Sequence, residues 1–179
     1  DLDKNSYATF EDLEPYLRGV ACSVGELAVR IFGCRNTSEE NLKDYVRLFG
    51  CAFQMTNIMR DVGADLELGR VYLPEADMKE AGYSRQELIR REPTPAFARL
   101  MEMEYNRAAG FYRRARNCVD FRDRPALLPA EIMARIYEKI LEEMRQDGFR
   151  VLFKRYRVSR LGKIACVLDS WLYCHGIHL

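Results

Sequence analysis

Four side chains that end in oxygen-bearing groups recur at helical spacing within residues 54–65. Gln54, Asn57, Asp61 and Asp65 fall within an arc of about 80° if each residue advances about 100° around a helix axis. Carboxylates four residues apart repel by about 0.2–0.5 kcal/mol in an isolated helix, unless a positive group binds between them. Mg²⁺ typically binds through one or two carboxylates together with phosphate oxygens. The pattern therefore predicts a magnesium–phosphate site, and the alternative is a solvated helix face with scattered aspartates.

The opposite side of the same stretch is apolar, since Met55, Ile58, Met59 and Val62 point away from the acidic face. We expect these four residues to lie in a hydrophobic core. Several arginines lie near the acidic face or later in the chain, and the guanidinium group is the natural bidentate partner of phosphate. Most of the 28 Lys and Arg residues are better explained as a solvated basic surface.

Two motifs resemble those of the squalene/phytoene synthase family. Residues 54–74 read QMTNIMRDVGADLELGRVYLP and are similar to the family's second aspartate-rich motif, including its G-R-x-Y-L-P tail. Residues 16–25 read YLRGVACSVG and resemble the Y-x-x-x-V-A-G-x-V-G helix that lines the family's prenyl-chain tunnel. Cys22 stands where the family usually has glycine, which leaves the preferred chain length open.

The resemblance implies a transferase that joins two prenyl diphosphates, farnesyl or geranylgeranyl, head to head. The product is a cyclopropylcarbinyl diphosphate, diphosphate is released, and the pathway is carotenoid or hopanoid biosynthesis. Mg²⁺ is the implied cofactor, and NADPH is left open. The implied metal ligands are Asn57, Asp61 and Asp65, and the implied catalytic residues are Asp61, Asp65 and Tyr16. Implied substrate contacts are Gln54, Asn57, Arg60, Arg70, Tyr72, Tyr137 and Arg155, although the three tyrosines also fit core positions.

One departure from the family pattern concerns its first motif, a separate D-x-x-x-D on a facing helix. Nothing upstream of Tyr16 can serve as this motif, and Asp1 and Asp3 have the wrong spacing. We therefore expect the chain to be the C-terminal two-thirds of a family member, inactive by itself. An apolar groove, exposed where further helices would pack, would favour self-association.

Two other functions remain as alternatives. An inactive assembly or scaffold protein is disfavoured because Asn57, Asp61 and Asp65 are all present. Another class I terpenoid synthase, such as a cyclase, is disfavoured by the G-R-x-Y-L-P tail and the helix at residues 16–25.

The bulk composition limits the partners. A net charge of +1 over 179 residues argues against a nucleic-acid-binding surface. No apolar run reaches membrane-spanning length and the first residues are no signal peptide. The six cysteines form no C-x-x-C pair and are expected as reduced thiols. We expect a cytoplasmic protein, with peripheral membrane contact left open.

Capping signals predict the helices. Thr9 with Asp12, Thr37 with Glu40 and Ser84 with Glu87 read as capping boxes, and Thr94 precedes a proline. The helix opened by Thr37 should run to about Leu66, and a last helix should span residues 159–174. Pro74 and Pro129 should lie in first turns, with stops near Gly33, Gly82 and Gly148. No hairpin signal occurs. These signals predict one all-α domain over residues 1–179. The family resemblance further implies an isoprenoid synthase-type bundle around a prenyl-chain cavity that lacks its N-terminal helices.

Overall fold

The computed structural model describes residues 6–177, apart from the side chains of residues 20–24, 26 and 30. Within that range every regular element is helical, which confirms the predicted all-α class. In chain order the elements are α1 (Phe10–Phe32), α2 (Glu39–Glu67), α3 (Glu75–Ala81), α4 (Arg85–Ile89), α5 (Pro95–Asn117), η1 (Phe121–Asp123), α6 (Leu128–Gln146), η2 (Arg150–Leu152) and α7 (Arg160–Cys174). Asp1 and Asp3 lie outside the described residues.

Most of the predicted caps are confirmed. The Thr9 hydroxyl accepts from the Asp12 backbone N–H at 3.3 Å, and the Asp12 carboxylate accepts from the Thr9 N–H at 3.2 Å. Ser84 and Glu87 form the same reciprocal pair, and Thr94 caps α5 ahead of Pro95. These bonds satisfy backbone donors that the first turn of a helix leaves without partners. The local sequence therefore determines where α1, α4 and α5 begin.

The predicted cap at Thr37 is wrong, because Ser38 caps α2 and accepts from the Asn41 N–H. The Thr37 hydroxyl instead donates to the buried Asp123 carboxylate at 2.8 Å and accepts from the Asp120 N–H. Because Thr37 binds Asp123, which is 86 residues away in sequence, Ser38 and not Thr37 caps the helix. Smaller shifts occur at Pro74, which is the N-cap of α3, and at Gly148, which follows the α6 C-cap with φ of 67°.

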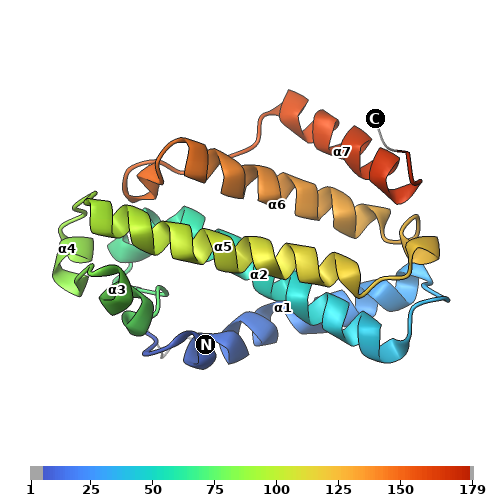
Figure 1. Ribbon diagram of the computed structural model, residues 1–179, viewed down its shortest axis with the longest axis horizontal. Helices are drawn as coiled ribbons and strands as arrows, with labels where there is room; N and C mark the ends of the chain where they lie inside the picture. The colour runs from blue at the N-terminus through green and yellow to red at the C-terminus, as the bar shows by residue number, and fades with distance from the viewer. Residues whose placement is uncertain (1–5, 178–179) are drawn as a thin grey trace.

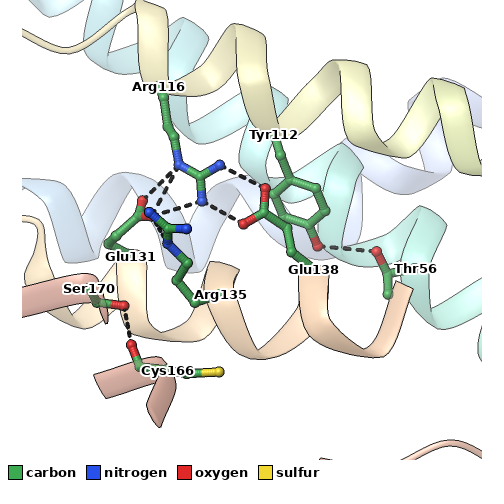
Figure 2. Close-up of polar contacts among 8 residues, drawn as sticks. All are labelled: Thr56, Tyr112, Arg116, Glu131, Arg135, Glu138, Cys166 and Ser170. Atoms are coloured by element: carbon green, nitrogen blue, oxygen red, sulfur yellow. Dashed lines mark hydrogen bonds and ion pairs between the residues drawn. The ribbon is translucent and has the colours of Figure 1, made fainter. Parts of the chain in front are cut away.

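Helix α2 lies at the centre of the bundle and packs against α1, α5 and α6 (Figure 1). Met55, Ile58, Met59 and Val62 are all buried, as the sequence predicted. A cluster of paired arginines and glutamates joins α5 to α6 (Figure 2). Helix α7 packs against α6 at the edge of the molecule, and α3 and α4 lie together at one end of the long helices.

Two glycines allow close packing on α2. A Cβ atom on Gly63 would lie 2.7 Å from the Leu152 carbonyl oxygen, so only glycine lets η2 approach α2 at this point. A Cβ on Gly25 of α1 would lie 2.6 Å from a Val46 methyl group. The close approach of α1 to α2 therefore occurs at Gly25, whereas Gly19 is exposed. The side chains of Ala21, Cys22 and Ser23 lie outside the described part of the chain.

Candidate active site

Helices α1, α2 and α6 enclose a cavity of about 500 Å³. Its walls are mostly apolar or aromatic, and the aromatic residues are Phe32, Tyr45, Phe49, Phe53 and Tyr137. This volume lies within the roughly 300–1,000 Å³ that small-molecule sites usually have. The cavity is therefore large enough to hold an apolar chain, and most of its wall is apolar.

Three residues with polar groups lie together at one end of the cavity wall. Gln54 and Asn57 on α2 line the cavity together with Tyr137 on α6. The Oδ1 atom of Asn57 is buried and has no hydrogen-bond partner among the described residues. A buried acceptor without a partner is uncommon in folded proteins and points to a missing ligand or water. The structure thus brings three predicted substrate-binding residues together.

Asp61 lies one helical turn beyond Asn57, and Asp65 lies a further turn along α2. Neither lines the large cavity, because each turn advances about 5.4 Å along the helix axis. Asn57, Asp61 and Asp65 therefore do not all line one cavity. They instead form a row that starts at its polar end and continues past it.

The carboxylate of Asp61 is held by two arginines. Arg60 donates from Nη2 at 2.6 Å and from Nε at 3.0 Å. Arg155, from the segment after η2, donates from Nε at 2.8 Å and from Nη2 at 3.3 Å. Burial alone would raise the pKa of Asp61, but the bonds and charges of both arginines outweigh it and lower the pKa. Asp61 is therefore an ionised carboxylate at neutral pH.

Asp65 differs from Asp61, since no hydrogen bond or ion pair reaches its carboxylate from the residues that the structure describes. Burial, followed by the negative charge of Asp61, raises the pKa of Asp65 to about 6, against opposing effects of Arg70 and Arg155. Asp65 lines a small hollow together with Arg70 and Tyr72. Its carboxylate is thus available to a cation.

Three tyrosine rings stack beside this hollow. The Tyr16 and Tyr72 ring centroids lie 5.5 Å apart with an interplanar angle of 12°, and Tyr7 packs on both. Burial, the Tyr72 side chain and the charge of Asp65 raise the pKa of Tyr16 to about 12. Tyr16 therefore keeps its proton at neutral pH and can act as a hydrogen-bond donor. The rings offer aromatic faces, which attract cations.

Tyr7 was missed by sequence reasoning. It lies two residues before the Thr9 cap, and its carbonyl accepts from the Glu75 N–H while that of Ala8 accepts from the Ala76 N–H. These bonds hold the start of the chain against α3. The only local signal was an aromatic residue two positions ahead of a helix cap.

The remaining predicted residues lie close to the row. The pKa of Arg60 is raised despite burial, because Arg60 donates hydrogen bonds to Asp61 and also interacts with Tyr137. Arg60 therefore connects the acidic row to the cavity wall. Tyr137 packs edge-on against Phe53 at 5.1 Å. Within residues 6–177 no three His, Cys, Asp or Glu side chains gather as a metal cluster, so a cation here would rely on two carboxylates, the Asn57 amide and ligand oxygens.

The family model for squalene/phytoene synthases matches residues 1–162. The chain belongs to the squalene/phytoene synthase family. The family resemblance of residues 16–25 and 54–74 is thereby confirmed.

Family members of known name and structure support this. The chloroplastic phytoene synthase 1 of Arabidopsis thaliana is 32% identical over 170 residues, which are 93% of this chain and 40% of that protein. A dehydrosqualene synthase solved in complex with ligand superposes with a TM-score of 0.81 at 27% identity, covering 97% of this chain and 60% of the other. Squalene synthase HpnC from Alicyclobacillus acidocaldarius superposes with a TM-score of 0.61 at 30% identity, covering 84% and 52%.

This family member spans about 40% of the length of the plant relative and 52–60% of the two solved chains. The likeness to these synthases confirms the isoprenoid synthase-type helical fold. The names of these relatives imply that the relatives themselves transfer prenyl groups.

Proposed function

We propose that this chain forms part of a prenyltransferase active site that condenses two prenyl diphosphates head to head with the help of Mg²⁺. The observation that supports this function is the continuity between an apolar cavity and the row of Asn57, Asp61 and Asp65 at its polar end. A prenyl diphosphate has the same two parts, an apolar tail and an anionic head.

The residues of the row fit a magnesium ion. Asn57 provides a buried carbonyl oxygen without a partner, Asp61 an ionised carboxylate, and Asp65 a carboxylate that no arginine pairs. These are the hard oxygen ligands that Mg²⁺ prefers, and diphosphate oxygens would complete the set. When bound, the ion would neutralise the negative charge that develops on the leaving diphosphate.

The arginines and tyrosines of the chain have separate roles in this proposal. Arg60 and Arg155 hold the carboxylate of Asp61, and the same guanidinium groups suit diphosphate oxygens. Arg70 lies beside Asp65 in the hollow, where it can hold a second anionic group. Tyr16 donates a hydrogen bond, and the rings of Tyr16 and Tyr72 can steady positive charge.

The chemistry of this proposal is the one that family membership implies. The C1–O bond of one prenyl diphosphate breaks, and its electron pair leaves with diphosphate. The double bond of the second prenyl chain attacks the resulting allylic cation, and loss of a proton closes a cyclopropane ring that keeps its own diphosphate. The apolar wall of the cavity contributes by excluding water, which would otherwise quench the cation.

Ligand binding tests this proposal on the chain itself. Thiodiphosphate analogues of farnesyl and geranylgeranyl diphosphate, which resist ionisation, are titrated by calorimetry with and without Mg²⁺. We expect Mg²⁺ to strengthen binding at least about 10-fold, and Asp65→Asn to remove that gain. Asp44→Asn is the matched control, because Asp44 lies on the same helix but pairs with Arg47 instead. If Mg²⁺ did not change the affinity for the analogues, or if both variants lost the Mg²⁺-dependent gain equally, the row would be a solvated surface.

Turnover is a separate measurement. We expect no condensation product from the 179-residue chain by itself, because the family holds its metal ions between two acidic helices and this chain contributes one. Formation of a C30 or C40 product by the chain alone would show that a second acidic helix is dispensable. Failure of the chain to bind either analogue under any condition would favour the scaffold alternative.

A further inference from the structure

Four parts of the chain meet around a small hollow that the acidic row does not use. They are α2, the end of α5 with the connection that follows it, the start of α6, and the end of α7. The hollow has a volume of about 20 Å³, which is room for one particle of about the size of a water molecule. Its lining residues Val119, Arg124 and Tyr173 are partly exposed. A small solute can therefore reach it.

The side chain of Arg124, which lines this hollow, has no charged partner. Within the described residues it forms no ion pair, and its Nε atom is buried without a hydrogen-bond partner. The guanidinium carbon lies 4.7 Å from the centroid of the Tyr173 ring. Stacking of this kind covers a face of the planar group, whereas the N–H donors point outward along its edge. A buried N–H donor without a partner is uncommon and indicates a missing ligand or water.

The arginines next to Arg124 are already balanced by carboxylates. Arg116 donates to both Glu131 and Glu138 (Figure 2). Arg135 adds a bond to Glu131 at 3.1 Å. Two positive and two negative groups cancel in this network. The positive charge of Arg124 is therefore left over.

Asp123, which precedes Arg124 in the sequence, does not balance it either. The Asp123 carboxylate accepts five hydrogen bonds, all from residues 35–37, and Asp123 does not line the hollow. Its acceptor capacity is thus used to hold the start of α2. A cation that is partly buried without a counter-charge is unfavourable, so Arg124 calls for an anion.

The other polar groups around the hollow are neutral. Burial raises the pKa of Tyr45 and of Tyr173, and burial followed by the charge of Glu131 raises the pKa of Cys174 to about 11. All three groups keep their protons at neutral pH and add no negative charge. Among the lining residues only Glu131 is acidic, and its carboxylate is paired. The hollow is therefore a small positive site.

We propose that this hollow binds a single monatomic anion, with chloride as the physiological ligand. The anion accepts a hydrogen bond from Nε of Arg124 and neutralises the guanidinium. The hydroxyl and thiol groups of Tyr45, Tyr173 and Cys174 provide further polar surroundings. A hollow with room for one water-sized particle suits a halide ion. A phosphate or sulfate group contains several atoms and does not fit inside it.

The anion ties the end of α7 to the rest of the bundle. Helix α7 lies at the edge of the molecule and packs mainly on α6 (Figure 1), and like the other helices in the described range it is not long and apolar enough to span a membrane. The family match ends at residue 162, so Tyr173 and Cys174 lie beyond it. Tyr45 lines both the hollow and the large cavity. Any effect on a prenyl ligand rests on the proposed function, whereas anion binding itself does not.

Bromide replaces chloride and makes the site visible. Crystals of the chain are grown in sodium bromide, and diffraction is recorded at the bromine absorption edge. We expect an anomalous peak inside the hollow, within hydrogen-bonding distance of Nε of Arg124. This experiment uses the unaltered chain, so it does not depend on any variant that fails to fold.

Thermal unfolding measures the same site in solution. Sodium chloride replaces sodium gluconate at constant ionic strength, and gluconate is too large for the hollow. We expect chloride to raise the melting temperature by about 2–5 °C, because a ligand that binds only the folded chain stabilises it. Arg124→Gln should remove this rise. Arg122→Gln is the matched control, since Arg122 lies two residues away in an exposed pair with Asp120, and it should keep the rise.

Two results would overturn the anion site. The bromide data could show no anomalous peak in the hollow, which would assign the hollow to water. The two variants could respond to chloride alike, both keeping the rise or both losing it, which would make the effect a property of the whole surface.

Discussion

Two clusters of arginines and carboxylates occupy this helical bundle, and they differ in how completely their members are paired. In the α5–α6 cluster, Arg116 donates to both oxygens of Glu131 and of Glu138, with the shortest bonds at 2.7 Å (Figure 2). Arg135 adds a further bond to Glu131 at 3.1 Å. Two positive and two negative groups thus balance. Burial would lower the pKa of Arg116, but the two glutamates outweigh it and raise the pKa.

The cluster at the acidic row also contains arginines and carboxylates, but not every carboxylate in it is paired. Arg60 and Arg155 both bind Asp61, while Asp65 has no partner among the described residues and the Oδ1 atom of Asn57 is likewise unpaired. A fully satisfied network stabilises a fold, whereas buried groups left incomplete usually belong to a site that binds something else. The comparison therefore separates a structural clamp from a candidate active site on their hydrogen bonds alone.

The largest expected effect is a loss of turnover when the acidic row is changed. Asp61→Asn should lower the turnover of prenyl diphosphate at least about 100-fold, because a ligand for the leaving-group charge is lost. The assay uses this chain with a family partner segment that carries the first D-x-x-x-D motif. Stability should fall by about 1–3 kcal/mol, because Arg155 is exposed but Arg60 is largely buried and loses its charged partner. Near wild-type turnover with unchanged Mg²⁺ dependence would contradict the role of Asp61.

A change in the α5–α6 cluster should mainly lower the stability of the fold. Arg116→Met leaves Glu131, whose side chain is only 5% exposed, without its main partner, and should lower the free energy of unfolding by about 3–5 kcal/mol. Arg122→Met is the control, because its ion pair with Asp120 is exposed and should contribute about 1 kcal/mol or less. Urea unfolding of both variants measures the difference. Equal losses would mean that the α5–α6 cluster is no clamp.

The sequence predicted those features that depend on local spacing. The row from Asn57 to Asp65, the core face of α2 and the caps at Thr9, Ser84 and Thr94 all follow from helical periodicity and capping chemistry. Arg155 was predicted only through family resemblance, because it reaches Asp61 across 94 positions. That contact depends on Gly63, which lets η2 approach α2. The sequence around Gly63 gives no sign that η2 packs against it.

Other features could not be found from spacing. Thr37 and Ser38 are both good caps, and Asp123 decided between them by binding Thr37. The α5–α6 cluster needs Arg116 from another helix, so the spacing of Glu131, Arg135 and Glu138 on α6 cannot by itself predict it. The assignments of Tyr16, Tyr72, Tyr137 and Arg70 stay predictions, although all four lie at the cavity or beside the acidic row.

A third cluster tests whether an incomplete network always marks a site. Arg107 binds both Asp77 at 2.7 Å and Glu104 at 2.6 Å, so one guanidinium serves two carboxylates. Glu104 is fully buried, and its Oε1 atom has no partner among the described residues. Burial first, and then Asp77, raise the pKa of Glu104 to about 8 although Arg107 opposes them. A proton on Glu104 would leave the three groups electrically neutral.

The pH dependence of stability follows from that shift. A carboxyl whose pKa is higher in the folded than in the unfolded chain stabilises the fold fully below its unfolded pKa, and the stabilisation disappears as pH rises through the folded value. The free energy of unfolding should therefore fall between pH 5 and about pH 9, and Glu104→Gln should flatten the curve. Glu102→Gln, at an exposed pair with Arg145, should leave it unchanged. A wild-type curve that rises toward pH 9 would contradict a neutral Glu104.

The smallest expected effect concerns Tyr45, which lies between the two clusters. Its ring packs on Phe49 at a centroid distance of 4.6 Å and lines the cavity as well as a hollow of about 20 Å³ bounded by Arg116 and Glu131. Tyr45 precedes Asn57 by twelve residues, which places it about 18 Å along α2 from the polar end. A prenyl tail that starts at the acidic row would therefore meet this ring far from its diphosphate.

Tyr45→Leu should lengthen the cavity and favour the longer tail. We expect the ratio of affinities for the geranylgeranyl and farnesyl thiodiphosphates to rise up to about 10-fold, since each extra apolar group accommodated contributes about 1–3 kcal/mol at most. Phe53→Leu is the matched control, because Phe53 packs against Tyr137 near the polar end, so its loss should weaken both analogues alike. If Tyr45→Leu also weakens both equally, the tail does not reach the α5–α6 cluster, and the cavity is filled from another direction.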